Sequence, residues 1–142
     1  MLDTNVLLAA TDEGRADHVA ALAVLDEWPG QGTTLYVSGQ IVREYLAVAT
    51  RPPASNGLGL SLSDATTNAR AIRERSRFVG EDHKVSGRLL ELVEQNHCAG
   101  KQVHDANIVA TMLVHGIEAI VTLNTADFAR FDEHIQVIKL SP

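Results

Sequence analysis

The chain has 142 residues, of which 45% are hydrophobic and 21% charged, enough to bury the core of one domain. It carries no apolar run near the roughly 20 residues that cross a bilayer, and no signal-peptide pattern follows Met1, so we expect a soluble, cytoplasmic protein. Twelve Lys and Arg against eighteen Asp and Glu give a charge of -6, which repels polyanions, and the single Cys98 excludes an internal disulfide and a thiolate zinc cluster.

Short β-like runs alternate with segments of helical periodicity, which is typical of an α/β fold with a mainly parallel sheet. In chain order we expect a very short strand at 1–2, a helix at 17–28, a strand at 35–37, helices at 38–50 and 63–75, β-like residues at 78–79, helices at 85–95 and 104–115, and strands at 119–122 and 136–140. Residues 6–8 fit either the first strand or a following helix. Ser38 and Ser63 are expected helix N-caps, and Phe128 and Phe131 are expected anchors in a turn.

Four acidic residues fall at element ends or on inward helix faces. Asp3 and Asp127 each follow a strand, whose carboxyl end lines the ligand crevice in open α/β sheets. Glu44 shares a helix face with apolar residues, and Asp105 heads the apolar stripe of its helix. Two like charges about 4 Å apart repel by roughly 4 kcal/mol at an effective dielectric near 20. Such a cluster favours a divalent cation, and oxygen ligands without His or Cys favour Mg²⁺ or Mn²⁺, whose bound water can hydrolyse a phosphodiester.

Each of these acids also has an ordinary structural interpretation. Asp3 and Asp105 fit helix N-caps, whose carboxylates accept backbone N–H bonds. Glu44, if buried, needs a partner such as an arginine. Asp127 fits a solvated loop residue. The spacing alone therefore leaves the metal cluster as one of two interpretations.

Four stretches in order resemble the PIN domain: residues 2–8 (LDTNVLL), residues 38–46 with Glu44, residues 104–106 (HDA), and residues 122–128 (TLNTADF). In size and in the lack of added domains the chain is similar to the VapC toxins of bacterial type II toxin–antitoxin pairs. The resemblance implies a single PIN-like domain over 1–142, with an α/β/α sandwich around a mainly parallel sheet. It also implies Mg²⁺- or Mn²⁺-dependent cleavage of RNA, a small VapB-type antitoxin as partner, and a homodimer.

The resemblance assigns the acidic, metal-binding site to Asp3, Glu44, Asp105 and Asp127. It gives supporting hydrogen bonds to Asn5, Thr122 and Asn124, although Asn5 alone fits a turn and Thr122 fits an ordinary strand residue. Only two residues precede Asp3, whereas the family's first strand is usually longer.

The chemistry expected of this site is in-line attack on phosphate by a metal-activated water. Any of the four acids, Glu44 among them, fits the role of proton acceptor. The six histidines show no metal-binding pair, and His104 fits a surface or capping role as well as a phosphate contact. Flanking phosphates are expected to be bound by basic side chains, which also fit solvated surface charges. These are Arg43, Arg51, Lys101 and Arg130.

Two segments are candidates for a partner surface, and three other classes of protein have sequence requirements that can be compared with this chain. Helix 17–28 and segment 52–79 fit a groove or dimer face, or an ordinary core. A module that grips RNA or antitoxin without cutting has no need of all four acids. A haloacid dehalogenase-type phosphatase needs a second Asp two residues after Asp3, where Asn5 stands, and a phospho-acceptor domain needs an Asp and late Lys pair that the pattern does not offer.

Overall fold

A computed structural model describes residues 1–141 of the chain. Its two named strand pairs are both parallel: β1 (Tyr36–Ser38) pairs with β2 (Arg77–Val79), and β3 (Ala119–Thr122) pairs with β4 (Gln136–Lys139). The short β1 and β3 both end next to polar residues of the candidate site.

The first residues of the chain lie between these two pairs. The Leu2 N–H donates to the Tyr36 carbonyl at 2.9 Å, and the Val121 N–H donates to the Met1 carbonyl at 2.9 Å. Leu2 also forms a parallel bridge with Val121. The expected first strand is thus a single bridge residue, and it joins the two pairs in the spatial order β2, β1, residues 1–3, β3 and β4.

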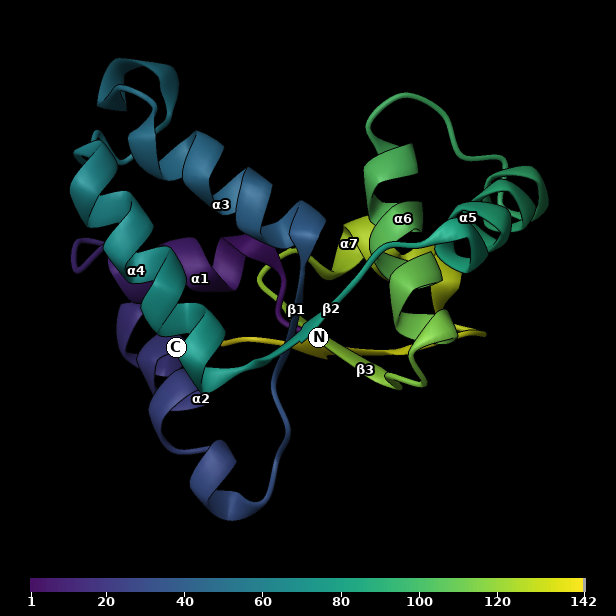
Figure 1. Cartoon of the computed structure of the whole chain (residues 1–142), viewed down its shortest axis with the longest axis horizontal. Coiled ribbons are helices and arrows are strands. Elements are labelled where there is room, and N and C mark those ends of the chain that lie inside the picture. Colours follow the sequence, from purple (N-terminus) through teal and green to yellow (C-terminus); the bar gives the residue numbers. More distant parts are fainter. Residues whose placement is uncertain (142) are drawn as a thin grey trace.

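Helices cover both faces of this sheet. In Figure 1, α1 to α4 lie on one side of the strands and α5 to α7 on the other. Their bounds are α1 Thr4–Thr11, α2 His18–Asp26, α3 Gly39–Thr50, α4 Leu62–Arg75, α5 His83–Gln95, α6 Gln102–Val114 and α7 Thr125–Phe128. This is the expected α/β/α sandwich. Within residues 1–141, no helix combines the length and the apolar character needed to cross a membrane.

The core between the layers fixes the helices that carry the acidic residues. Ile41 and Tyr45 are 0% and 1% exposed and anchor the inner face of α3. Phe128 and Phe131, the two expected anchors, are 1% and 0% exposed after β3. Burying one such side chain contributes about 1.5–3 kcal/mol. Glu44, which directly precedes Tyr45, is therefore on a helix that cannot turn freely.

The structure corrects one expected cap and resolves one ambiguity. Ser61, rather than Ser63, caps α4: its Oγ accepts from the Asp64 N–H at 3.0 Å and donates to Asp64 Oδ2 at 2.7 Å. The helix therefore begins at Leu62. Residues 6–8 belong to α1, and the other expected helices and strands are found within a few residues of their predicted bounds.

Candidate active site

Asp3 lies where the bridge residue ends and α1 begins. Its Oδ1 accepts from the Thr4 N–H at 2.7 Å, so it does cap α1. Its Oδ2 accepts from Thr122 Oγ1 at 2.6 Å and from Asn5 Nδ2 at 2.7 Å. Burial raises the pKa of Asp3 above its usual value, an effect that the bonds from Thr122 and Thr4 oppose and the charges of Glu44 and Asp127 reinforce. Asp3 therefore caps α1 with one carboxylate oxygen, and its other oxygen accepts from Thr122 and Asn5.

Glu44 projects from α3 toward the same region. Its Oε2 accepts from Thr4 Oγ1 at 2.8 Å, and its Oε1 accepts from Gln40 Nε2 at 2.7 Å. Within residues 1–141 the expected arginine partner is absent, because Arg43 pairs instead with Glu81 at 3.6 Å. Neutral donors orient Glu44, so its negative charge remains uncompensated.

Asp105 stands in the first turn of α6, which begins at Gln102 after an N-cap at Lys101. The N-cap interpretation of Asp105 is therefore wrong. Its carboxylate receives no hydrogen bond from the described part of the chain. Burial, and then the charges of Asp127, Asp3 and Glu44, raise the pKa of Asp105 to about 6. All three other acids thus act electrostatically on it.

Asp127 lies in the short helix α7 directly after β3. Asn124 Nδ2 donates to its Oδ2 at 2.6 Å, and the Asn124 N–H donates to Thr122 Oγ1 at 3.0 Å. Thr122 is completely buried and also accepts from Asn5 Nδ2 at 3.0 Å. Thr122 is therefore the common partner of Asp3, Asn5 and Asn124, which goes beyond the role of an ordinary strand residue.

The elements that carry the four acids are tied together by hydrogen bonds. Gln40 Nε2 donates to the His104 carbonyl at 3.0 Å as well as to Glu44, and so connects α3 to the turn that holds Asp105. Among residues 1–141, no Lys, Arg or His lies within salt-bridge distance of any of the four carboxylates. The site therefore concentrates negative charge that no ion pair compensates, and His104, the smallest of the influences on the pKa of Asp105, opposes the rise only in part.

The spacing of these acids is wider than a compact metal-binding shell. Within the described residues, no three His, Cys, Asp or Glu side chains converge closely enough to enclose a metal ion. Carboxylates repel one another, and Mg²⁺ commonly binds one or two carboxylates and keeps several of its waters. The donor chemistry therefore fits a hard divalent cation, with fewer direct protein ligands than the four acids expected.

A second set of polar residues supports the site and was not identified from the sequence. Gln40 is only 5% exposed, and its Oε1 accepts from Asn107 Nδ2 at 2.7 Å. Glu81 accepts from the Gln40 N–H at 2.7 Å and from Asn107 Nδ2 at 3.2 Å. Two spacings carried a local signal: Gln40 is one helical turn before Glu44, and Asn107 follows Asp105 by two residues. Glu81 carried none.

The basic residues expected near RNA lie on the surface. Arg43 is exposed beside the first turn of α3, Arg51 follows the last turn, and Lys101 precedes α6. Arg130 Nη1 donates to the Asn96 carbonyl at 3.5 Å. All four basic side chains are therefore accessible from solvent.

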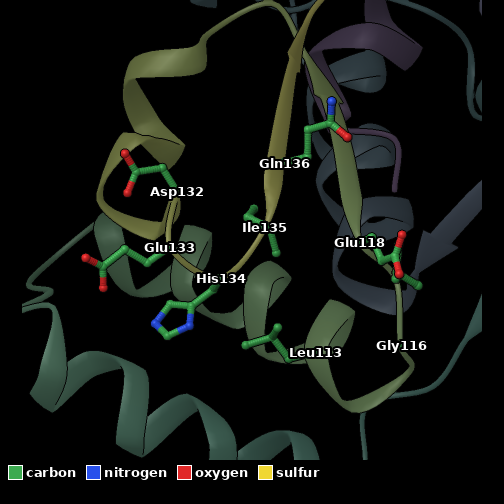
Figure 2. Close-up of a pocket in the computed structure, with 9 residues that line it drawn as sticks. Leu113, Gly116, Glu118, Asp132, Glu133, His134, Ile135 and Gln136 are labelled. Carbon is green, nitrogen blue, oxygen red and sulfur yellow. The ribbon is translucent and has the colours of Figure 1, made fainter.

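A large pocket lies away from this site. It has a volume of about 660 Å³ and opens beside the residues that precede β3 and β4, among them Glu118, Glu133 and His134 (Figure 2). The candidate site is instead built from residues that follow the strands. The pocket and the acidic residues are therefore at opposite ends of β3 and β4.

A parallel sheet between two helical layers, with acidic residues after its strands, defines a recognised class of domain. The PIN domain family model matches residues 1–134, and the chain belongs to the PIN domain family. A search of curated protein sequences finds no match.

Solved structures share the fold at low identity. One is VapBC2 from Rickettsia felis, in a complex with a DNA fragment from the VapBC2 promoter. It has a TM-score of 0.69 and 16% identity, and the match covers 99% of this chain and 98% of that one. Another is VapBC-1 from nontypeable Haemophilus influenzae, with a TM-score of 0.68, 18% identity and coverage of 100% and 98%. FitAcB from Neisseria gonorrhoeae has a TM-score of 0.65, 19% identity and coverage of 97% and 95%. These likenesses establish the fold over nearly the whole chain.

Proposed function

We propose that this PIN domain is a Mg²⁺- or Mn²⁺-dependent endoribonuclease and the toxin of a VapBC-type toxin–antitoxin pair. The observation that carries the proposal is that Asp3, Glu44 and Asp105 are buried or half-buried with no ion pair to any described residue, while the exposed Asp127 is near enough for its charge to raise the pKa of Asp3 and Asp105. Buried or half-buried carboxylates are costly without a partner. A divalent cation supplies that partner and is also the agent needed for phosphodiester hydrolysis.

The cation would bind among Asp3, Glu44, Asp105 and Asp127, with fewer than four of them as direct ligands and water in its other positions. Asn5 and Thr122 would fix the orientation of Asp3, and Asn124 that of Asp127. When bound, Mg²⁺ would polarise the scissile phosphate and lower the pKa of a coordinated water. Asp105 is the one of the four carboxylates to which no residue of 1–141 donates a hydrogen bond, so its oxygens can bind the ion or accept a proton. Both oxygens of Glu44 accept hydrogen bonds, from Thr4 and Gln40, so Glu44 fits the role of a metal ligand of fixed orientation better than that of a proton acceptor.

The proposed protein partner is a VapB-type antitoxin, because the structural neighbours are VapBC and Fit complexes. A pocket of about 210 Å³ between α1, α2 and α4 combines the apolar Leu7, Leu22 and Ile72 with the polar Asn68 and Arg75 and offers a mixed surface for it. All of these residues except Leu7 come from the segments singled out in the sequence as a possible groove. We further propose a homodimer that acts on RNA in the cytoplasm.

A cleavage assay with matched variants tests the nuclease assignment. Wild-type protein and Asp105→Asn are incubated with a panel of structured RNAs in Mg²⁺, Mn²⁺ or EDTA. We expect cleavage by wild type in either metal, no cleavage in EDTA, and at least a 100-fold slower rate for Asp105→Asn, in line with the loss of metal-dependent catalysis. Asp132→Asn, at an exposed position after the site, is the matched control. Cleavage by Asp105→Asn at the wild-type rate would remove the assignment.

A PIN-like module that binds RNA or antitoxin without cutting is the second candidate. It is favoured by one observation: no three potential ligands among residues 1–141 converge on one point. The same assay separates the two candidates, because the binding module retains RNA in a gel-shift experiment but releases no product in Mg²⁺ or Mn²⁺.

A further inference from the structure

An arginine-rich stretch runs along the end of α4 and into β2. Residues 70–77 (RAIRERSR) hold four of the chain's twelve Lys and Arg, in a protein of net charge -6. Short basic stretches of this kind are typical of nucleic-acid contacts. The stretch is not part of the acidic site, and from the sequence we interpreted it only within segment 52–79, as part of a groove, a dimer face or the core.

Two of these arginines share a surface with an exposed aromatic ring. Arg70 and Arg73, one helical turn apart, line a shallow pocket of about 280 Å³ together with Glu74 and Phe78. Arg73 Cζ lies 4.7 Å from the centroid of the Phe78 ring, a cation–π contact that holds the guanidinium in place. Phe78 is 46% exposed, so part of its ring remains open to solvent.

The charge of this surface is only partly compensated. Arg75 pairs with Asp26 at 2.8 Å, and Arg43 pairs with Glu81 at 3.6 Å. Within the described residues, neither Arg70 nor Arg73 forms an ion pair, and Glu74 is the one acid lining their pocket. Two guanidinium groups therefore give a local positive charge on an otherwise acidic molecule.

The surface is continuous with the first turn of α3, which leads to the acidic site. A Cβ atom on Gly39 would lie 3.2 Å from Arg43 Nη1, 3.5 Å from Glu81 Oε1 and 3.8 Å from Phe78 Cζ, and Arg43 pairs with that Glu81. The next residue, Gln40, donates to Glu44. Gly39 therefore lies between Phe78 and the residues that orient Glu44, and the paired charges of Arg43 and Glu81 lie beside it.

We propose that Arg70, Arg73 and Phe78 bind a single-stranded RNA segment that flanks the cleaved bond, the arginines at its phosphates and the open part of the ring under a base. This inference rests on the proposed nuclease function. Positive charge next to an exposed aromatic ring is the combination that binds single strands without sequence preference. Such a surface would also provide the local attraction that a protein of net charge -6 needs to bind RNA next to an acidic site.

The test measures the affinity for a fluorescein-labelled single-stranded RNA of mixed sequence by anisotropy, in EDTA and over a range of salt. Arg70→Gln combined with Arg73→Gln should weaken binding about 10-fold or more and reduce the slope of log affinity against log salt by about 1.4, since each phosphate contact contributes about 0.7. Phe78→Ala should weaken binding about 5-fold or more without changing the slope, and Phe78→Trp should retain the affinity.

The matched control is Arg15→Gln combined with Lys139→Gln, which removes the same charge from other parts of the surface. If this control loses as much affinity and slope as the Arg70 and Arg73 variant, the proposal is wrong. It is equally wrong if the Arg70 and Arg73 variant keeps its RNA affinity but shifts from dimer to monomer in sedimentation, since a second copy then covers the surface. Melting curves establish that each variant is folded.

Cleavage distinguishes failure of this surface from failure of the nuclease assignment. Suppose that wild type cleaves RNA, that Asp105→Asn does not, and that the arginine variants bind RNA as tightly as wild type. The nuclease proposal is then supported, and the proposal that Arg70, Arg73 and Phe78 bind RNA is wrong. If wild type does not cut RNA in either metal, the nuclease proposal falls regardless of how the arginine variants bind.

Discussion

Gln40 and Glu44 lie one turn apart on α3, and Gln40 Nε2 donates to Glu44 Oε1 over 2.7 Å while also donating to the His104 carbonyl over 3.0 Å. One buried amide thus sets both the direction of the Glu44 carboxylate and the distance from α3 to the first turn of α6. Partners of this kind commonly change metal affinity or activity 10–100-fold when removed.

Replacing Gln40 by Ala should therefore raise the Mg²⁺ concentration needed for half-maximal cleavage by about 10–100-fold, with a smaller effect on the maximal rate. The measurement is a cleavage rate at a series of Mg²⁺ concentrations. Gln95→Ala, at the exposed end of α5, is the control. A loss of maximal rate at unchanged Mg²⁺ dependence would contradict a role in positioning Glu44.

Thr122 should contribute to stability through its hydroxyl. Thr122→Val keeps the shape of the side chain but removes the donor to Asp3 and the acceptor for Asn5 and Asn124. Buried polar groups left without a partner cost about 1–3 kcal/mol of unfolding free energy. Urea unfolding should show this loss for Thr122→Val and much less for Thr122→Ser. Thr67→Val, on the exposed face of α4, should change little; equal losses at the two positions would refute the role of the hydroxyl.

The pH dependence of metal-free stability should carry the signature of Asp105. Its pKa is raised from 3.8 to about 6, so the folded state binds more protons than the unfolded state between these values. The free energy of unfolding should therefore fall as the pH rises from about 4 to 6. Asp105→Asn should reduce this slope in urea titrations run in EDTA. Identical slopes for the variant and wild type would show that Asp105 is not destabilised by its surroundings.

Mg²⁺ should stabilise the folded protein at neutral pH, because it compensates the four carboxylates. At ten times its dissociation constant, a ligand of the folded state contributes about 1.4 kcal/mol, which raises the melting temperature by roughly 5 °C for a chain of this size. Thermal melts with increasing Mg²⁺ measure the shift. Asp132→Asn should retain it and Asp105→Asn should lose most of it, whereas a shift equal in both would place the ion elsewhere.

The corrected cap of α4 gives a comparison between neighbouring serines. Ser61→Ala removes the acceptor of the Asp64 N–H and should cost about 1 kcal/mol of unfolding free energy. Ser63→Ala lies inside the helix and should have an effect near zero or slightly stabilising, since Ala favours helix. Urea unfolding of the two variants is sufficient. A larger cost at Ser63 would restore the cap expected from the sequence.

Two glycines should respond to alanine with opposite signs. A Cβ on Gly57 would lie 2.0 Å from the Arg51 carbonyl oxygen, so Gly57→Ala must displace the backbone and should cost about 1–3 kcal/mol. Gly87 is inside α5, where a Cβ would meet no atom of residues 1–141 within 4 Å, and Gly87→Ala should stabilise by about 0.5–1 kcal/mol. Melting temperatures that move in the same direction would contradict this loop geometry.

Much of the fold could be predicted from local pattern. The helix from 38 to 50 was expected with its Ser38 cap, and α3 has that cap and spans Gly39–Thr50. The cap of α4 was misplaced because both Ser61 and Ser63 have the right chemistry, and only the Ser61 Oγ bonds to the Asp64 N–H and carboxylate. The helix at residues 4–11 was ambiguous because its apolar run fits a strand equally well.

The sequence by itself determined which residue types stand after each strand and on each helix face, because periodicity, caps and the PIN motifs are local properties of the chain. Only the tertiary structure decided how those residues meet. The Thr122 bond to Asp3 joins residues 119 positions apart, and the Asn107 bond to Gln40 joins residues 67 apart. Such contacts depend on how the helical layers pack on the sheet, as do the raised pKa of Asp105 and the placement of Phe78 beside Gly39. The distances between residues so far apart in the chain cannot be predicted from local sequence patterns, which describe only near neighbours along the chain.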